Sequence, residues 1–329
     1  MLRLKPFKYL RPSTVEEAAS LAAELNGEAM MVAGGTDLVP KLKRRQMEPS
    51  ALIGIGHLEE LKSVDHLSDG GVSIGAAVTL SKVVGDGELL QRYPGYVRAA
   101  SLVSSPPLRN LGTIGGNLLV DTRCNYYDMT YEWRQAVGFC LKKDGDICRV
   151  APSSPRCWAV SSSDTAPVAI ALDASVVLVG PEGRREVPVS SLYQDDGIRY
   201  TTKQPDEVVA FLHFPPKDGW RSSYVKLRRR GSIDFPIGGA AAALRLQDGL
   251  VTEARIVLSG VASHPVIAEE AASCLIGRHL DDDAITEASE RAAKPARPLD
   301  NTDLAYTWRK RMVKHLVSQA ITEAAAPGR

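Results

Sequence analysis

The sequence lacks a strong net charge, and no long apolar run occurs in it. Its 40 Lys and Arg residues nearly balance its 39 Asp and Glu residues, so no overall positive field attracts nucleic acid or an anionic membrane. No apolar run approaches the length of a membrane span, and residues 1–8 contain no signal-peptide core. We therefore expect a cytoplasmic protein with no nucleic-acid or membrane partner.

Several well-known catalytic motifs are also missing. The sequence contains no G-x-G-x-x-G fingerprint, no G-x-x-x-x-G-K-[ST] loop, no H-E-x-x-H pair and no G-x-S-x-G nucleophile turn. These absences argue against a Rossmann dehydrogenase, a nucleoside triphosphatase, a zinc protease and a serine hydrolase. With 44% hydrophobic and 24% charged residues over 329 positions, the composition is typical of a globular protein with two or three packed units.

The apolar periodicity predicts two regions with different architectures. Strand and helix patterns alternate in the first region, which indicates mixed α/β structure, and three strand patterns followed by helices indicate an α+β second region. Prolines and glycine at 215–219 mark the boundary, so we predict domains at residues 1–217 and 218–329. Helices are predicted at residues 13–26, 38–43, 96–103, 164–172, 268–275, 282–293 and 303–322, and strands at 30–32, 51–55, 72–76, 175–179, 224–227, 239–246 and 255–258.

Two diglycine turns are the first candidate binding elements. Gly34-Gly35 and Gly115-Gly116 each follow an apolar or strand-like run. Adjacent residues without Cβ allow positive φ and close backbone approach, so successive N–H groups can converge on an anion such as a phosphate. Each pair could equally be a plain turn, which is the usual role of Gly-Gly.

The cysteines are unevenly distributed along the chain. Four of the five fall between residues 124 and 157, and Cys274 lies on the apolar face of a predicted helix, where we expect an ordinary buried thiol. Four thiolates suit zinc or an iron–sulfur cluster, and the segment contains no C-x-x-C pair. The spacing alone leaves both metals open.

The two glycine motifs together resemble a known family. Residues 33–38 and 109–118 are similar to the paired flavin motifs of the FAD-binding medium subunits in the xanthine dehydrogenase family of molybdenum hydroxylases, and the resemblance extends over nearly the whole chain. It implies a two-part FAD-binding domain of the vanillyl-alcohol-oxidase-like (PCMH) type, followed by a C-terminal antiparallel sheet with helices of the CO-dehydrogenase flavoprotein type. The FAD-site residues that it implies are Ala33, Gly34, Gly35, Thr36, Asp37, Leu38, Asn110, Thr113, Gly115, Gly116, Asn117, Asp164 and Lys226. For the last two, an N-cap and a solvated strand lysine are the alternative readings.

The cysteine-rich segment at about 122–160 looks inserted. It resembles the corresponding segment of 4-hydroxybenzoyl-CoA reductase β subunits, which implies a [4Fe–4S] cluster on Cys124, Cys140, Cys148 and Cys157. The resemblance further implies that electrons from a ferredoxin pass through this cluster and FAD to two [2Fe–2S] centres on a small subunit and to molybdopterin on a large subunit. The complex would be a dimer of heterotrimers that reductively dehydroxylates an aromatic acyl-CoA, with no catalytic residue on this chain.

Two other functions remain open at this point. The first is an FAD subunit of an oxidative molybdenum hydroxylase, in which the four cysteines bind zinc and the electrons run in the opposite direction. The second is a non-catalytic scaffold stapled by zinc, in which both glycine motifs are only turns.

Overall fold

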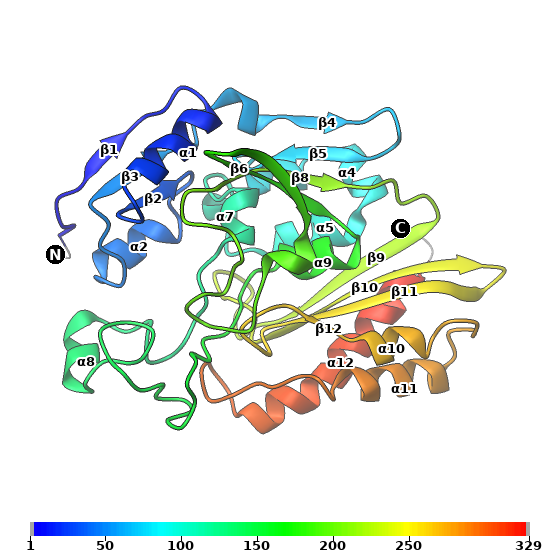
Figure 1. Cartoon of the computed structure of the whole chain (residues 1–329). Helices are drawn as coiled ribbons and strands as arrows, with labels where there is room; N and C mark the ends of the chain where they lie inside the picture. Colours follow the sequence, from blue (N-terminus) through cyan, green and yellow to red (C-terminus); the bar gives the residue numbers. More distant parts are fainter. Residues whose placement is uncertain (1–2, 327–329) are drawn as a thin grey trace.

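Three β-sheets organise the chain, of which the computed structural model describes residues 3–326 (Figure 1). A three-stranded parallel sheet has the order β1-β3-β2, a five-stranded antiparallel sheet has the order β4-β5-β8-β6-β7, and a four-stranded antiparallel sheet has the order β12-β11-β10-β9. The strands are β1 (Lys8–Leu10), β2 (Ala29–Val32), β3 (Ala51–Gly54), β4 (Val64–His66), β5 (Val72–Gly75), β6 (Ser175–Gly180), β7 (Gly183–Pro188), β8 (Val208–Phe214), β9 (Trp220–Leu227), β10 (Gly238–Gln247), β11 (Leu250–Ser259) and β12 (Val266–Ile267).

The helices cover the sheet faces. They are α1 (Val15–Glu24), α2 (Leu38–Lys43), α3 (Leu80–Val84), α4 (Gly87–Arg92), α5 (Pro94–Leu102), α6 (Pro106–Arg109), α7 (Ile114–Leu118), α8 (Tyr131–Ala136), α9 (Thr165–Ala171), α10 (Glu269–Ser273), α11 (Asp282–Ala292) and α12 (Tyr306–Ala325), with short 3-10 helices at Glu59–Lys62 and Val189–Leu192. The predicted first helix is confirmed, and both ends of its cap are satisfied: the Thr14 hydroxyl accepts a hydrogen bond from the Glu17 amide at 3.1 Å, and the Glu17 carboxylate accepts one from the Ser13 amide at 2.6 Å.

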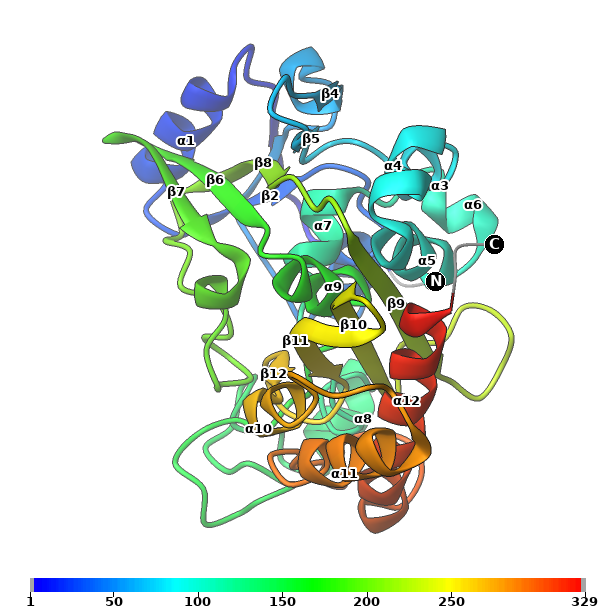
Figure 2. The same cartoon turned by 90° about the vertical axis from the view of Figure 1, so that its right-hand side faces the viewer.

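The C-terminal sheet lies between two helical layers (Figure 2). Helices α10, α11 and α12 pack on one face, and α5 and α9 of the first region pack on the other. Alternate residues of β10 therefore enter different cores: Ala241 and Ala243 face α5 and α9, whereas Ala240 and Ala242 face the C-terminal helices. The small alanines allow both helical layers to approach the strand closely. The predicted combination of a mixed α/β region and an α+β C-terminal region is confirmed.

The cysteine-rich segment is the least regular part of the described chain. It contains α8 and isolated bridges, and it extends from the sheets below the N-terminal sheet in Figure 1. Arg134 of α8 fastens it to the protein, because this buried guanidinium donates to the carbonyls of Arg44 and Arg45, each at 3.0 Å, just after α2. Cys274 is less buried than predicted: it is the C-cap of α10 and packs against the C-terminal core, but it is only half-buried.

Candidate functional site

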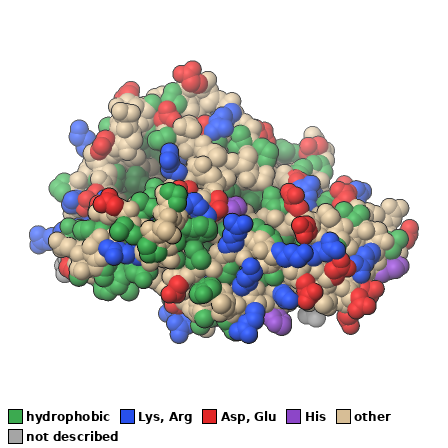
Figure 3. All heavy atoms as spheres, turned by 60° about the horizontal axis from the view of Figure 1, so that its bottom comes forward, with side chains coloured by type: hydrophobic (Ala, Val, Ile, Leu, Met, Phe, Trp, Pro, Cys, Tyr) green, Lys and Arg blue, Asp and Glu red, His purple; other side chains and the backbone are tan. Residues whose placement is uncertain are grey.

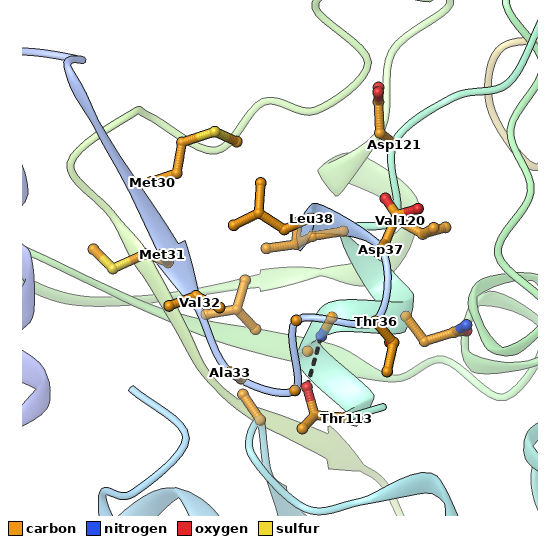
Figure 4. A pocket seen from close by; sticks show the side chains of 18 of the residues that line it. Met30, Met31, Val32, Ala33, Thr36, Asp37, Leu38, Thr113, Val120 and Asp121 are labelled. Carbon is orange, nitrogen blue, oxygen red and sulfur yellow. Dashed lines mark hydrogen bonds between the residues drawn. The ribbon is translucent and has the colours of Figure 1, made fainter. Parts of the chain in front are cut away.

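The two glycine turns line one cavity of about 560 Å³. Residues 33–38 form one wall, and Gly112, Thr113, Gly115, Gly116 and Asn117 form another (Figure 4). Strand β2 contributes Met30 and Met31, and the segment that leads into β8 completes the lining. A second cavity of about 550 Å³ shares Ala33, Gly34 and Thr113 with the first and is lined by Asn110. Elements far apart in the sequence thus meet around two neighbouring cavities that share lining residues.

The glycines are required for different reasons. A Cβ on Gly34 would overlap the carbonyl of Leu111, so the first turn lies directly on the second. Gly35 has a φ of +67°, which a residue with a side chain rarely adopts. A Cβ on Gly115 would come within 2.8 Å of the Ala76 Cβ, whereas a Cβ on Gly116 would meet only the Thr113 hydroxyl at 3.1 Å. Gly116 therefore leaves room in the cavity that a methyl group would fill.

The backbone amides of the two turns differ in their hydrogen bonds. In the second turn, Ile114 and Gly115 donate to Val78 and Ala76 carbonyls at 2.9 Å, and Gly116 donates to the Thr113 hydroxyl at 3.2 Å. This turn is the start of helix α7, with Thr113 as its N-cap, and not only the turn that the sequence suggested. Among the hydrogen bonds of residues 3–326, none uses the amides of the first turn at 34–36. The first turn therefore offers free donors to an anion, and the second offers close packing and space.

Asp121 is a buried carboxylate in the cavity wall (Figure 4). Its two oxygens pair with Lys142 at 2.6 Å and with Lys41 at 2.8 Å, and both lysine side chains are also buried. Burial alone would raise the pKa of Asp121, but the charges of Lys142 and Lys41 lower it to about 2. The neighbouring Asp37 pairs with Arg123. Both carboxylates of this wall are therefore paired with adjacent cations.

The predicted residues Asp164 and Lys226 form a buried ion pair and do not belong to the cavity lining. Their Nζ–Oδ2 distance is 2.7 Å, and the Tyr224 hydroxyl donates to the other oxygen of Asp164 at 2.9 Å. Burial raises the pKa of Asp164, and Lys226 opposes the rise. Asp164 occupies the N-cap position of α9, as one alternative had it, but its side chain makes no capping hydrogen bond. The alternative of a solvated Lys226 is wrong, because only 1% of its side chain is exposed. The pair links the start of α9 to strand β9.

The predicted residues Asn110 and Asn117 both have side-chain partners in the protein. Asn117 accepts from the hydroxyls of Ser163 at 3.1 Å and Thr165 at 2.7 Å, so it ties the second glycine turn to α9. Asn110 accepts from the Ser81 hydroxyl at 2.6 Å at the second cavity. Each asparagine fixes a segment that lines a cavity.

All four cysteines of the cysteine-rich segment are buried. Cys124, Cys140 and Cys157 pack with Tyr127 in one small cluster. Burial raises the pKa of Cys157 to about 11, with the nearby Cys148 and Cys140 adding to the rise and Lys142 opposing it. In residues 3–326, however, no group of three or more His, Cys, Asp or Glu side chains is arranged to hold a metal ion. The structure thus gathers the thiols into one region, and the predicted ligand set is not confirmed.

Several site residues had no predicted role. Lys41 and Lys142 are lysines in unremarkable sequence contexts, and nothing in the sequence distinguishes a buried lysine from a solvated one. Asp121 lies three residues before Cys124, and this position was the one feature of the sequence that could have indicated a role in the site. The lining segment at 200–209 has an ordinary loop-to-strand composition and gave no signal at all.

Comparisons with known proteins show the family of the chain. Residues 5–217 match the family described as the FAD binding domain in molybdopterin dehydrogenase, and residues 222–324 match the CO dehydrogenase flavoprotein C-terminal domain. The chain belongs to the FAD-binding subunits of this oxidoreductase family, the molybdenum hydroxylases.

Individual relatives extend over most of the chain. The carbon monoxide dehydrogenase medium chain of Afipia carboxidovorans is 28% identical over 321 residues, which are 97% of each chain. The aldehyde oxidoreductase FAD-binding subunit of Escherichia coli K12 is 32% identical over 274 residues, which are 80% of this chain and 83% of the relative. The structure of carbon monoxide dehydrogenase from Hydrogenophaga pseudoflava, in a form that lacks the Mo-pyranopterin moiety, superposes with a TM-score of 0.80 at 27% identity and covers 98% of each chain. The predicted family is confirmed, and the closer likeness to 4-hydroxybenzoyl-CoA reductase stays a prediction.

Within the described part of the chain, no helix combines the length and the apolar character needed to traverse a bilayer.

Proposed function

We propose that this chain is the FAD and [4Fe–4S] electron-transfer subunit of a molybdenum-containing complex like 4-hydroxybenzoyl-CoA reductase. The observation that carries the proposal is the position of the four buried cysteines, whose segment touches the wall of the FAD cavity through Lys142 and Asp121. In this proposal, residues 1–217 form the FAD-binding domain with the cysteine-rich insertion, and residues 218–329 form the C-terminal domain.

The cavity suits a dinucleotide with a diphosphate at its centre. The free amides at 34–36 and the Thr36 hydroxyl would hold the diphosphate, and the open space at Gly116 allows the ligand to approach the backbone. The methionines of β2 and the other apolar lining residues would exclude water from the ring systems. When bound, FAD supplies electron-transfer chemistry, which the protein positions and tunes.

The cysteine region suits an anionic thiolate centre. The thiols are shielded from water, and the Ala159 amide lies 3.4 Å from the Cys157 sulfur, as expected of an N–H donor to a metal-bound sulfur. Four buried thiols suit an iron–sulfur cluster or a zinc ion. The resemblance of the cysteine-rich segment to that of 4-hydroxybenzoyl-CoA reductase β subunits is what favours the cluster.

The proposed partners follow from the family. A molybdopterin-containing large subunit and a small subunit with two [2Fe–2S] centres would complete a dimer of heterotrimers, and a ferredoxin would donate electrons. Exposed Met129, Trp133 and Ile147 give the cysteine-rich segment an apolar surface, and on the face in Figure 3 hydrophobic side chains gather at the left, where this segment lies. This surface supports contact with a partner protein.

The chemistry of the complex would take place elsewhere. Removal of a phenolic hydroxyl from an aromatic acyl-CoA as water consumes two electrons and two protons at molybdenum on the large subunit. On this chain, the lysines beside Asp121 neutralise a carboxylate that would otherwise repel an anionic cofactor. No residue of this chain is assigned a catalytic role.

An oxidative molybdenum hydroxylase with zinc on the cysteines is the second candidate. It is favoured by the names of the similar proteins, among them a carbon monoxide dehydrogenase and an aldehyde oxidoreductase. The third hypothesis, a non-catalytic scaffold stapled by zinc, disagrees with membership of an FAD-binding family and is not pursued.

Metal and flavin analysis of the anaerobically purified full chain tests the proposal. About four iron and one FAD per chain are expected from the ligand count. The Cys148→Ser variant should lose iron, and Cys274→Ser, which changes a thiol outside the insertion, should keep it. Stoichiometric zinc without iron would reject the cluster and favour the second candidate.

A redox titration separates the two directions of electron flow. The reductive route requires a cluster whose reduction potential is low enough to reduce the flavin. A cluster potential above that of the flavin would contradict the entry of electrons at the cysteines.

A further inference from the structure

The second cavity, which shares part of the first glycine turn with the first cavity, is lined by basic side chains. Among the described residues that line it are Arg11, His57, Lys62 and Lys82, and none is Asp or Glu. Buried apolar residues such as Val78 form other parts of its wall. A cleft that combines one sign of charge with apolar walls concentrates its electric field on a ligand of the opposite sign. The second cavity therefore favours an anionic ligand.

Two of these cations lack an acidic partner. Within residues 3–326, neither Arg11 nor Lys82 forms an ion pair with an Asp or Glu side chain. The Lys82 ammonium group donates to the Lys62 carbonyl at 2.7 Å, which holds it beside the Lys62 backbone. Lys62 itself pairs with Glu59 at 2.8 Å. The charges of Arg11 and Lys82 are thus available to an anion that enters the cavity.

An aromatic ring also lines the second cavity. Tyr9 belongs to β1, an edge strand of the N-terminal sheet, and a Cβ added to Gly54 of β3 would overlap the Tyr9 hydroxyl. The missing side chain at Gly54 therefore gives the ring room to lie across the neighbouring strand. Tyr9 is still 60% exposed, and Leu111, another lining residue, is 59% exposed. The cavity is thus open to solvent, and the Tyr9 ring has surface left for stacking on a planar ligand.

We propose that the second cavity binds a soluble nucleotide that is distinct from FAD. The phosphate oxygens of this nucleotide accept hydrogen bonds from Arg11 and Lys82, and its base stacks on the Tyr9 ring. A nucleotide suits the lining because it combines an anionic end with an aromatic end, and the volume of about 550 Å³ is typical of a small-molecule site. Inorganic phosphate would use the cations alone. The inference goes beyond the proposed function and does not depend on a metal at the cysteines.

Isothermal titration calorimetry of the FAD-saturated full chain with ADP tests the inference. We expect about one ADP to bind per chain, and adenosine and inorganic phosphate to bind at least about tenfold more weakly, because each makes only part of the contacts. Arg11→Met and Lys82→Met should each raise the Kd for ADP about tenfold, since each removes a charge-assisted hydrogen bond. The matched control is Lys8→Met, which should leave this Kd unchanged, because Lys8 is exposed one position before Tyr9 and does not line the cavity.

Substitutions at Tyr9 separate recognition of the base from recognition of the phosphate. Tyr9→Leu should raise the Kd for ADP about tenfold and leave phosphate binding unchanged, whereas Tyr9→Phe keeps the ring and should bind ADP like the wild type. Equal affinities for ADP and inorganic phosphate would overturn the assignment to a nucleotide. Loss of ADP binding at saturating FAD, or a wild-type Kd in both Arg11→Met and Lys82→Met, would overturn the separate site. These outcomes leave the proposed function untouched, because flavin and metal contents are measured independently.

Discussion

Gly115 and Gly116 are adjacent, and the structure predicts opposite consequences for an alanine at each. Both belong to helix α7, so alanine gains helix propensity of roughly 0.5–1 kcal/mol at either position. At Gly115 this gain is exceeded, because the new methyl group would come within 2.8 Å of the Ala76 Cβ, and overpacking costs roughly 1–3 kcal/mol. At Gly116 the methyl group would meet only the Thr113 hydroxyl and would otherwise project into the cavity.

We therefore expect Gly116→Ala to preserve the stability of the flavin-free chain and to weaken FAD binding. Displacement of one well-packed contact should raise the Kd for FAD about tenfold, or about 1.4 kcal/mol. Urea unfolding of the flavin-free chain and titration with FAD, followed by flavin fluorescence, measure the two effects separately. Gly115→Ala is the matched comparison and should lower the free energy of unfolding.

Two results would refute this reasoning. If Gly116→Ala binds FAD with the wild-type Kd, the space at this glycine does not face the cofactor. If Gly116→Ala is destabilised as much as Gly115→Ala, the second turn serves only to pack the fold.

Three further predictions concern ion pairs and a helix cap. Because the folded pKa of Asp121 is about 2 and the unfolded value is 3.8, its contribution of about 2 kcal/mol is present above pH 4 and lost as the pH falls toward 2. Asp121→Asn should therefore reduce the free energy of unfolding at neutral pH by at least this amount and flatten its acid dependence in urea titrations, while Asp65→Asn, at an exposed position, should leave both unchanged. Lys226→Met leaves the buried Asp164 without its cation and should lower the free energy of unfolding by about 3–5 kcal/mol. The double variant with Asp164→Asn should recover part of this loss. Strictly additive effects in the double-mutant cycle would contradict the pairing. Thr14→Ala removes the N-cap of α1 and should lower the thermal midpoint by the equivalent of about 1 kcal/mol, and an unchanged midpoint would show that the cap contributes nothing.

Local sequence patterns predicted most of the regular elements because those elements follow local rules. The helix pattern at residues 13–26, the apolar run before Gly34 and the strand-like run at 239–246 each describe short-range geometry, and each element was found close to its predicted bounds. Strands with weaker patterns were missed, among them β1 and β7, since pairing with a neighbouring strand stabilises them more than their own composition does.

Part of the candidate site followed from the sequence in the same way. The diglycine turns could be recognised because close backbone approach and positive φ leave few residue types possible. The cysteines could be recognised because their clustering is improbable by chance. The pairing of Asp164 with Lys226, by contrast, joins α9 to β9 and depends on the packing of the C-terminal sheet against the first region.

The sequence by itself determined the family, the order of the two architectures and the residue types available to an anionic cofactor and to a metal. Only the tertiary structure decided that the two turns touch, that the first keeps its amides free, and that two lysines are buried around Asp121. The physical reason is that a turn or a helix cap is stabilised by neighbours in the chain, whereas the burial of a charge depends on partners that long-range folding alone brings together.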